Sequence, residues 1–158
     1  TMERARATLA DARRVIDDLR KTDLSSLREA IRLEAEHFTV ATGIPCEADI
    51  SCPDLLPEPI KEAAIRAVSE GLTNIARHAR AKKATLRAAA SEGLNEMVIE
   101  IADDGIGFDP DLVEAGHYGL LGMRERVRLA GGILEIRSKA GSGTTLVIHF
   151  PLNGYEDG

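Results

Sequence analysis

The sequence has few aromatic residues, no tryptophan and no excess of positive charge. Phe, Tyr and Trp make up 3% of the 158 residues, and the formal net charge is −6. Proteins that bind nucleic acid present basic surfaces, and single-strand binders add aromatic side chains on which bases stack. The composition therefore argues against a nucleic-acid partner. An anionic ligand would need backbone N–H groups, a metal ion or a few well-placed cations.

The sequence also has only two cysteines and no long apolar run. Cys46 and Cys52 lie too far apart for a zinc pair, and no second pair of Cys or His completes a site. A disulfide stays open, but two reduced thiols are the default and predict a cytoplasmic location. No stretch approaches the ~18 apolar residues of a membrane span, and no signal peptide is visible. We expect no membrane contact by this chain, although a longer parent protein could be anchored in the inner membrane.

Four segments have the apolar spacing of helices. In residues 3–21 the apolar positions recur three and four apart, which draws a narrow stripe typical of a coiled-coil or bundle seam. This segment begins in helical rhythm without a cap, as in a piece of a longer chain. Further helices are predicted at about 24–42, with Ser25 or Ser26 near the cap and Gly43 as the stop, at 59–78 and at 120–130.

Five shorter segments are typical of strands, at residues 44–50, 83–91, 95–103, 133–139 and 144–151. In the strand at 95–103, alternation predicts that Met97, Ile99 and Ile101 point inward. Adjacent strands follow one another in pairs, with helices gathered between them, and residues 104–119 form a loop before the last helix. This order predicts an α+β fold in which helices cover a mixed sheet.

The helix at residues 59–78 carries polar residues beside its apolar stripe. The members of this stripe are Ile60, Ala64, Ala67, Val68, Gly71, Leu72 and Ile75. At 100° per residue, Glu70, Asn74 and Arg77 fall within about 60° of one another. Carboxylate and amide oxygens are ligands that Mg²⁺ accepts, and arginine can hold a phosphate. The alternative is a solvated helix face, with His78 as a histidine satisfied at the helix end.

Glycine clusters follow in the second half of the sequence, but none is a P-loop or a G-x-G-x-x-G motif. The stretch "DDGIGFD" at 103–109 fits either an Asp-Gly hairpin turn or a loop that places a carboxylate against a ligand. "GHYGLLG" at 116–122 opens a helix whose free N–H groups could receive phosphate oxygens. "GSGTT" at 141–145 separates two strands.

The order of these motifs resembles the ATP-binding domain of sensor histidine kinases, within the class shared with gyrase, the heat-shock chaperone and mismatch-repair ATPases. "EGLTNIARHA" resembles the N box, and "DDGIGF", "GHYGLLGMRERV" and "GSGTTL" resemble the three glycine boxes in order. The wording "HYGLLGMRERVRLAGG" is most similar to the subfamily that signals to LuxR/NarL-type response regulators. The resemblance implies a two-layer α/β sandwich of the Bergerat type, with helices on one face of the sheet.

The resemblance assigns the adenine end of a nucleotide site. Asp103 matches the aspartate that accepts the exocyclic amine of adenine, and Thr144 matches the threonine that assists it. Gly105 and Gly107 would let the backbone pass close beneath the base. Asp104 lies outside the motif's ligand position and is interpreted as turn chemistry.

The resemblance also assigns the phosphate end. Asn74 matches the asparagine that coordinates Mg²⁺, and Glu70 matches the residue that supports it, through water at the metal. These two are the expected catalytic residues. Arg77 takes the basic place near the phosphates, and His78 lies near the ribose and phosphates. The lid and helix start that cover the phosphates contribute Gly119, Leu120 and Gly122.

One departure from the family pattern concerns the phosphoacceptor histidine. The family carries it on a first dimerisation helix with an acidic residue directly after it, and none of the four histidines here has that context. We therefore expect that this helix is absent, that residues 1–22 are a remnant of the second dimerisation helix, and that residues 23–158 are the ATP-binding domain.

The function expected from the resemblance is transfer of the γ-phosphoryl group of Mg-ATP to a histidine on a dimerisation domain, for relay to a response regulator. The expected partners are ATP, the protein's own dimerisation domain and a LuxR/NarL-type regulator, and the parent is expected to be a homodimer. Two alternatives stay open: an anti-sigma-type serine kinase, and a non-catalytic interaction module with a degenerate ATP site.

Overall fold

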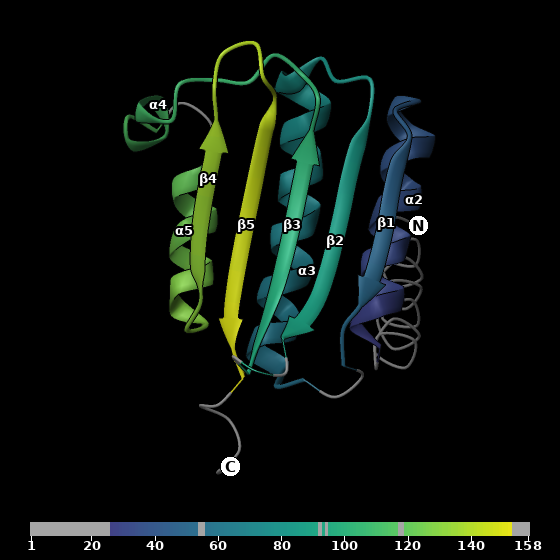
Figure 1. Ribbon diagram of the computed structural model, residues 1–158, viewed down its shortest axis with the longest axis vertical. Helices are drawn as coiled ribbons and strands as arrows, with labels where there is room; N and C mark the ends of the chain where they lie inside the picture. The colour runs from purple at the N-terminus through teal and green to yellow at the C-terminus, as the bar shows by residue number, and fades with distance from the viewer. Residues whose placement is uncertain (1–25, 54–55, 92, 94, 117–118, 153–158) are drawn as a thin grey trace, which may run out of the picture.

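The structure, a computed structural model, describes residues 26–53, 56–91, 93, 95–116 and 119–152. Five strands form one sheet in the order β1-β2-β3-β5-β4 (Figure 1). β1 runs parallel to β2, and every other neighbouring pair is antiparallel, so the sheet is mixed as predicted. The strands are β1 (Cys46–Ser51), β2 (Ala84–Ser91), β3 (Glu96–Asp103), β4 (Ile133–Ser138) and β5 (Thr144–Pro151).

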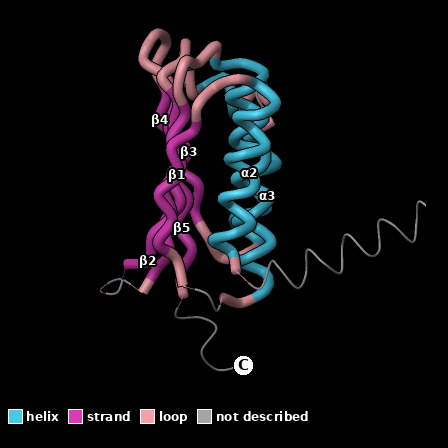
Figure 2. The backbone as a smooth tube through the Cα atoms, turned by 90° about the vertical axis from the view of Figure 1, so that its right-hand side faces the viewer, coloured by secondary structure: helices cyan, strands magenta, loops and turns pink. Residues whose placement is uncertain are grey.

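The helices lie on one side of this sheet (Figure 2). They are α2 (Leu27–Thr42), α3 (Glu58–Asn74), the π-helix η1 (Ile75–Ala79), α4 (Asp111–Glu114) and α5 (Leu120–Leu129). α2 contacts β1, α3 contacts β3, and α5 contacts β4. The predicted two-layer α+β architecture with helices on one face is therefore confirmed.

The ends of α2 follow from local chemistry. The Ser26 hydroxyl accepts a hydrogen bond from the Glu29 backbone N–H at 3.3 Å, which caps the first turn. Gly43 ends the helix in the left-handed conformation at φ 77°, and its N–H donates to the Thr39 carbonyl. Both predicted end signals are confirmed. The predicted helix over residues 1–22 lies outside the described residues.

The core forms where the inner face of the sheet meets α3. Alternate residues of β3 are buried, because successive side chains of a strand point to opposite faces. They meet an apolar stripe on α3 that continues into η1, and every member of the predicted stripe is buried. The buried residues of the two facing surfaces are Met97, Ile99 and Ile101 on β3, and Ile60, Ala64, Ala67, Val68, Gly71, Leu72 and Ile75 on the helix.

The third helix departs from the prediction in its last turn. We predict a single α-helix from residue 59 to about 78, but the α-helix ends at Asn74 and a π-helix continues to Ala79. Arg80 then takes the left-handed conformation at φ 48°. π-turns are rare and occur mainly at functional sites. The apolar spacing does not reveal this change, because Ile75 and Ala79 are buried in either geometry.

The segment before α5 is also more ordered than predicted. We expect a loop over residues 104–119, but Asp111–Glu114 form the short helix α4. Asp109 begins this turn, since its carboxylate accepts the Asp111 backbone N–H at 3.0 Å. Val113 is 1% exposed, so the short helix adds one apolar side chain to the core.

The outer face of the sheet carries charged and polar side chains. His149 on β5 contacts Glu96 on β3, with 3.3 Å between Nδ1 and a carboxylate oxygen, and its Nε2 is 3.7 Å from Glu135 on β4. His149 pairs in register with Val98 and Ile133, so Glu96 and Glu135 are its diagonal neighbours on the adjacent strands, within reach of long side chains. Apolar residues, among them Val98, Val147 and Ile133, share this face with the charged ones, and the main apolar core lies between the sheet and the helices.

Candidate nucleotide-binding site

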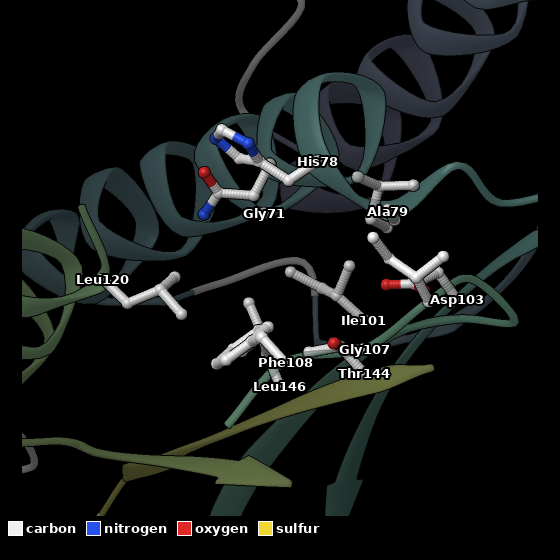
Figure 3. A pocket seen from close by; sticks show the side chains of 13 residues that line it. Gly71, His78, Ala79, Ile101, Asp103, Gly107, Phe108, Leu120, Thr144 and Leu146 are labelled. Atoms are coloured by element: carbon white, nitrogen blue, oxygen red, sulfur yellow. The ribbon is translucent and has the colours of Figure 1, made fainter. Parts of the chain in front are cut away.

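A pocket opens between the end of α3 and the adjoining ends of β3 and β5. Figure 3 shows His78 and Gly71 on the helical side, and Asp103 and Thr144 on the side of the strands. Most of the wall between them is apolar. The lining residues are Gly71, Asn74, Ile75, His78, Ala79, Ile101, Asp103, Ile106, Gly107, Phe108, Leu120, Thr144 and Leu146.

Asp103 is the last residue of β3 and places the one carboxylate among these lining residues. Its Oδ1 accepts the backbone N–H of Gly105 at 2.8 Å, and Asp103 pairs in register with Thr144 on β5. Burial raises the pKa of Asp103, while hydrogen bonds from the backbone of Gly105 and Thr144 act in the opposite direction. The carboxylate is thus fixed in orientation, and its partial burial makes ionisation cost free energy.

The neighbouring carboxylate, Asp104, has a different task. It accepts the backbone N–H groups of Lys82 at 2.8 Å and Lys83 at 3.0 Å, at the start of β2. Asp104 is exposed to solvent, and its pKa is lowered mainly by the hydrogen bond from the Lys83 backbone and secondly by the one from Lys82. Asp104 therefore ties the loop to β2 and stays outside the pocket, as the turn interpretation predicts.

The two glycines after Asp103 bring backbone against backbone. A Cβ at Gly105 would collide with the carbonyl of Ala79, and the next N–H, of Ile106, donates to that same carbonyl at 2.7 Å. Gly107 has φ 65°, and a Cβ there would collide with the Lys139 carbonyl. Both positions require glycine because any side chain would push the loop away from its neighbours.

The π-helix positions the helical side of the pocket. The pocket is lined by Asn74, Ile75, His78 and Ala79. In an α-helix these four positions would cover a wider angle around the helix axis than in the wider π-helix. Arg77 is exposed and is not among the lining residues. The predicted grouping of Arg77 with Asn74 assumes 100° per residue, which does not hold past Asn74. The structure therefore brings Asn74 and His78 to the pocket and leaves Arg77 outside it.

Glu70 lies one turn before Asn74 but faces a different partner. Its carboxylate forms an ion pair with the guanidinium of Arg126 on α5, and it does not line the pocket. Gly122 lies beside this pair, since a Cβ there would be 3.5 Å from the Arg126 guanidinium. The sequence gives no signal for Arg126, because it lies fifty-six positions from Glu70 and only the folded structure brings α5 against α3.

The second glycine box supplies the start of α5. Gly119 is its N-cap in the left-handed conformation at φ 69°, and it is exposed. Leu120, which follows, is 2% exposed and lines the pocket. Of the three residues expected to cover the phosphates, the structure brings Leu120 to the pocket wall, and Gly119 and Gly122 lie on the same helix without lining it.

The apolar wall carries little signal in the sequence motifs. Ile101, Ile106, Phe108 and Leu146 line the pocket, whereas the motifs single out polar residues, glycines and, as the one apolar side chain, Leu120. Alternation along β3 gives a signal for Ile101, because it points to the same face as the buried Ile99. A slot with apolar walls and a carboxylate at one end matches a flat heterocycle that carries an N–H donor.

Residues 60–154 match the model of the family described as histidine kinase-, DNA gyrase B- and HSP90-like ATPases. The chain belongs to this ATPase family. It is 34% identical over 154 residues to the signal transduction histidine-protein kinase/phosphatase DegS of Brevibacillus brevis, which covers 96% of this chain and 39% of that protein. It is 26% identical to the nitrate/nitrite sensor protein NarX of Escherichia coli K12, over 78% of this chain and 21% of NarX.

Solved structures agree on the ATPase fold. The histidine kinase domain of the blue-light activated histidine kinase of Erythrobacter litoralis EL346 superposes with a TM-score of 0.67, at 24% identity. The superposition covers 80% of this chain and 61% of that chain. The chain spans less than half the length of these two curated relatives, DegS and NarX. Within its described residues, no helix is both long and apolar enough to cross a membrane.

The opposite pKa shifts of the two adjacent aspartates predict opposite effects on stability. At pH 7 we expect Asp103→Asn to raise the midpoint of thermal unfolding, because it removes the cost of ionising a buried carboxyl group. Asp104→Asn should lower the midpoint, because the ionised carboxylate accepts two backbone N–H groups.

The pH dependence follows from linkage. The raised pKa of Asp103 makes its contribution most favourable below the unfolded value of about 3.9, and that contribution is lost as pH rises through the folded pKa. The contribution of Asp104 is present above about 3.9 and is lost as pH falls through its lowered pKa. The Asp103→Asn difference from wild type should shrink as circular-dichroism melts are repeated from pH 7 towards pH 4. The Asp104→Asn difference should persist down to about pH 4 and shrink only below it. Shifts of the same sign in the two variants would contradict the assignment.

Proposed function

We propose that this chain is the ATP-binding catalytic domain of a two-component sensor histidine kinase. In this proposal the γ-phosphoryl group of ATP passes to a histidine on a dimerisation domain and then to a response regulator. The observation that carries it is the pocket itself, in which the fixed carboxylate of Asp103 closes one end of an apolar slot and Asn74 lines the other side. Membership of the ATPase family and the identity to DegS support it.

The adenine end rests on Asp103. A carboxylate held by the Gly105 N–H accepts a hydrogen bond from an exocyclic amine, and it repels a carbonyl oxygen at the same place. Ile101, Phe108 and Leu146 offer apolar surface to the faces of the base. The close backbone approach at Gly105 and Gly107 supports the same role, because no side chain at these positions would occupy the space beside the base.

The phosphate end rests on Asn74 and His78, with the start of α5 beside them. The amide oxygen of Asn74 is a ligand that Mg²⁺ accepts while it keeps several waters. Magnesium would neutralise charge on the transferred phosphoryl group, and the chain's own residues position and hold the nucleotide. Glu70 would assist only through water, since Arg126 already holds its carboxylate.

The partner we propose is a LuxR/NarL-type response regulator, reached through the dimerisation domain of a homodimeric parent in the cytoplasm. The second glycine box, "HYGLLGMRERVRLAGG", supports this subfamily. The identity to NarX is consistent with it.

Replacing Asp103 tests the adenine assignment. We expect Asp103→Asn to weaken ATP binding at least tenfold, or about 1.4 kcal/mol, because an amide group is a poorer acceptor for the amine and can present a donor instead. Isothermal titration calorimetry well below the unfolding temperature measures this. Asp104→Asn, in the same loop, is the matched control and should bind within about twofold of wild type. Wild-type affinity in Asp103→Asn would contradict the adenine assignment.

Replacing Asn74 tests the metal assignment. We expect Asn74→Ala to abolish the difference between ATP affinities measured with Mg²⁺ and with EDTA, because the amide oxygen that binds the ion is gone. Thr73→Ala is the control, since Thr73 is the exposed neighbour whose hydroxyl donates to the Ser69 carbonyl. A magnesium effect of unchanged size in Asn74→Ala would remove Asn74 from the metal site.

The activity itself is tested by phosphoryl transfer between separate proteins. The chain is mixed with ATP labelled at the γ-phosphate and with the dimerisation domain of a related sensor histidine kinase. We expect acid-labile, base-stable label on that domain, and none when its histidine is replaced by glutamine. Acid-stable label on a serine would instead support a serine kinase. ATP binding with no transfer to any partner would support a non-catalytic module.

A further inference from the structure

Ser138 lies directly behind the pocket and does not line it. It is the last residue of β4 and pairs in register with Thr144 on β5. Its hydroxyl oxygen accepts the backbone N–H of Phe108 at 2.8 Å. The same oxygen lies 2.8 Å from the Thr144 hydroxyl and 3.2 Å from the carbonyl oxygen of Gly143. Ser138 thus connects the loop after Asp103 to the hairpin that carries Thr144.

Counting protons decides how these contacts are made. Each hydroxyl has one proton to donate. If Ser138 donates to Gly143, the contact between the two hydroxyls must use the proton of Thr144. If Ser138 donates to Thr144, it makes no bond to the Gly143 carbonyl. Only the first arrangement uses all three contacts, and it forms a chain of aligned hydrogen bonds in which each strengthens the next.

This arrangement fixes what Thr144 offers to the pocket. With its proton directed at Ser138, the Thr144 hydroxyl presents lone pairs only, next to the carboxylate of Asp103 with which it pairs in register. Two acceptors then stand side by side at the base end of the pocket. A purine with a 6-amino group has donors to offer there, whereas a 6-oxo purine presents another acceptor.

We propose that Ser138 is a positioning residue that holds Thr144 as a hydrogen-bond acceptor and thereby sharpens selection of 6-amino over 6-oxo purine triphosphates. The inference rests on the proposed function, because it deepens the adenine assignment of that pocket. Ser138 acts through Thr144 and does not touch the nucleotide.

The test compares ATP with inosine triphosphate, which differs in carrying a 6-oxo group and an N1 proton. In Ser138→Ala the Thr144 proton loses its acceptor and becomes available to the pocket. We expect the dissociation constant of inosine triphosphate divided by that of ATP to fall about fivefold, which is the effect of one hydrogen bond. Ser138→Thr keeps a hydroxyl and should keep the wild-type ratio. Equal weakening of both nucleotides in Ser138→Ala would show a merely structural role and overturn the proposal.

A second variant keeps the test decisive if Ser138→Ala does not fold. Thr144→Val removes the hydroxyl that Ser138 is proposed to orient, so it should also lower the ratio, and adding Ser138→Ala to it should change the ratio no further. An unchanged ratio in Thr144→Val overturns the proposal. A wild-type chain that does not prefer ATP to inosine triphosphate contradicts the adenine assignment. A preference of undiminished size in Ser138→Ala contradicts only the role of Ser138.

Discussion

The site depends on the close approach of three backbone segments around the loop after β3. The Ala79 carbonyl at the end of η1 accepts the Ile106 N–H, and Gly105 lies against the same carbonyl. On the other side Gly107 meets the Lys139 carbonyl, and Gly143 approaches the carbonyl of Asp103. Backbone hydrogen bonds tolerate little displacement, so this contact fixes the loop between helix and hairpin. The position of Asp103 follows from it.

In the same loop, the adjacent residues Asp104 and Asp103 differ in role: Asp104 stabilises the loop, and Asp103 faces the pocket. Asp104 is exposed and accepts two backbone N–H groups, so its charge stabilises the turn. Asp103 is half-buried, and burial disfavours its charge. A carboxylate kept ionised in a partly apolar pocket has unsatisfied capacity to accept a hydrogen bond. The folded domain therefore bears a local cost at the position that we propose reads the base, which is common at functional sites.

The sequence predicts the fold well because its signals are local or periodic. The stripe at Ile60 to Ile75, the alternation in β3, and the cap at Ser26 each lie within one element, and each is confirmed. The site is predicted less completely. The π-turn after Asn74 leaves Arg77 outside the pocket, and nothing in the apolar spacing distinguishes five π-helical residues from α-helical ones. Contacts such as Ser138 with Phe108 join residues thirty positions apart, and only the assembled sheet brings them together.

The ion pair between Glu70 and Arg126 bears on how a metal would enter the proposed site. Arg126 compensates the charge of the carboxylate one turn from Asn74, and Asn74 itself is neutral. A neutral amide oxygen alone attracts Mg²⁺ weakly, because the ion is strongly hydrated and gives up water reluctantly. In the proposed site Asn74 would hold the ion together with the negative charge that a bound triphosphate supplies. The ion pair joins α3 to α5, the two helices that bring Asn74 and Leu120 to the pocket.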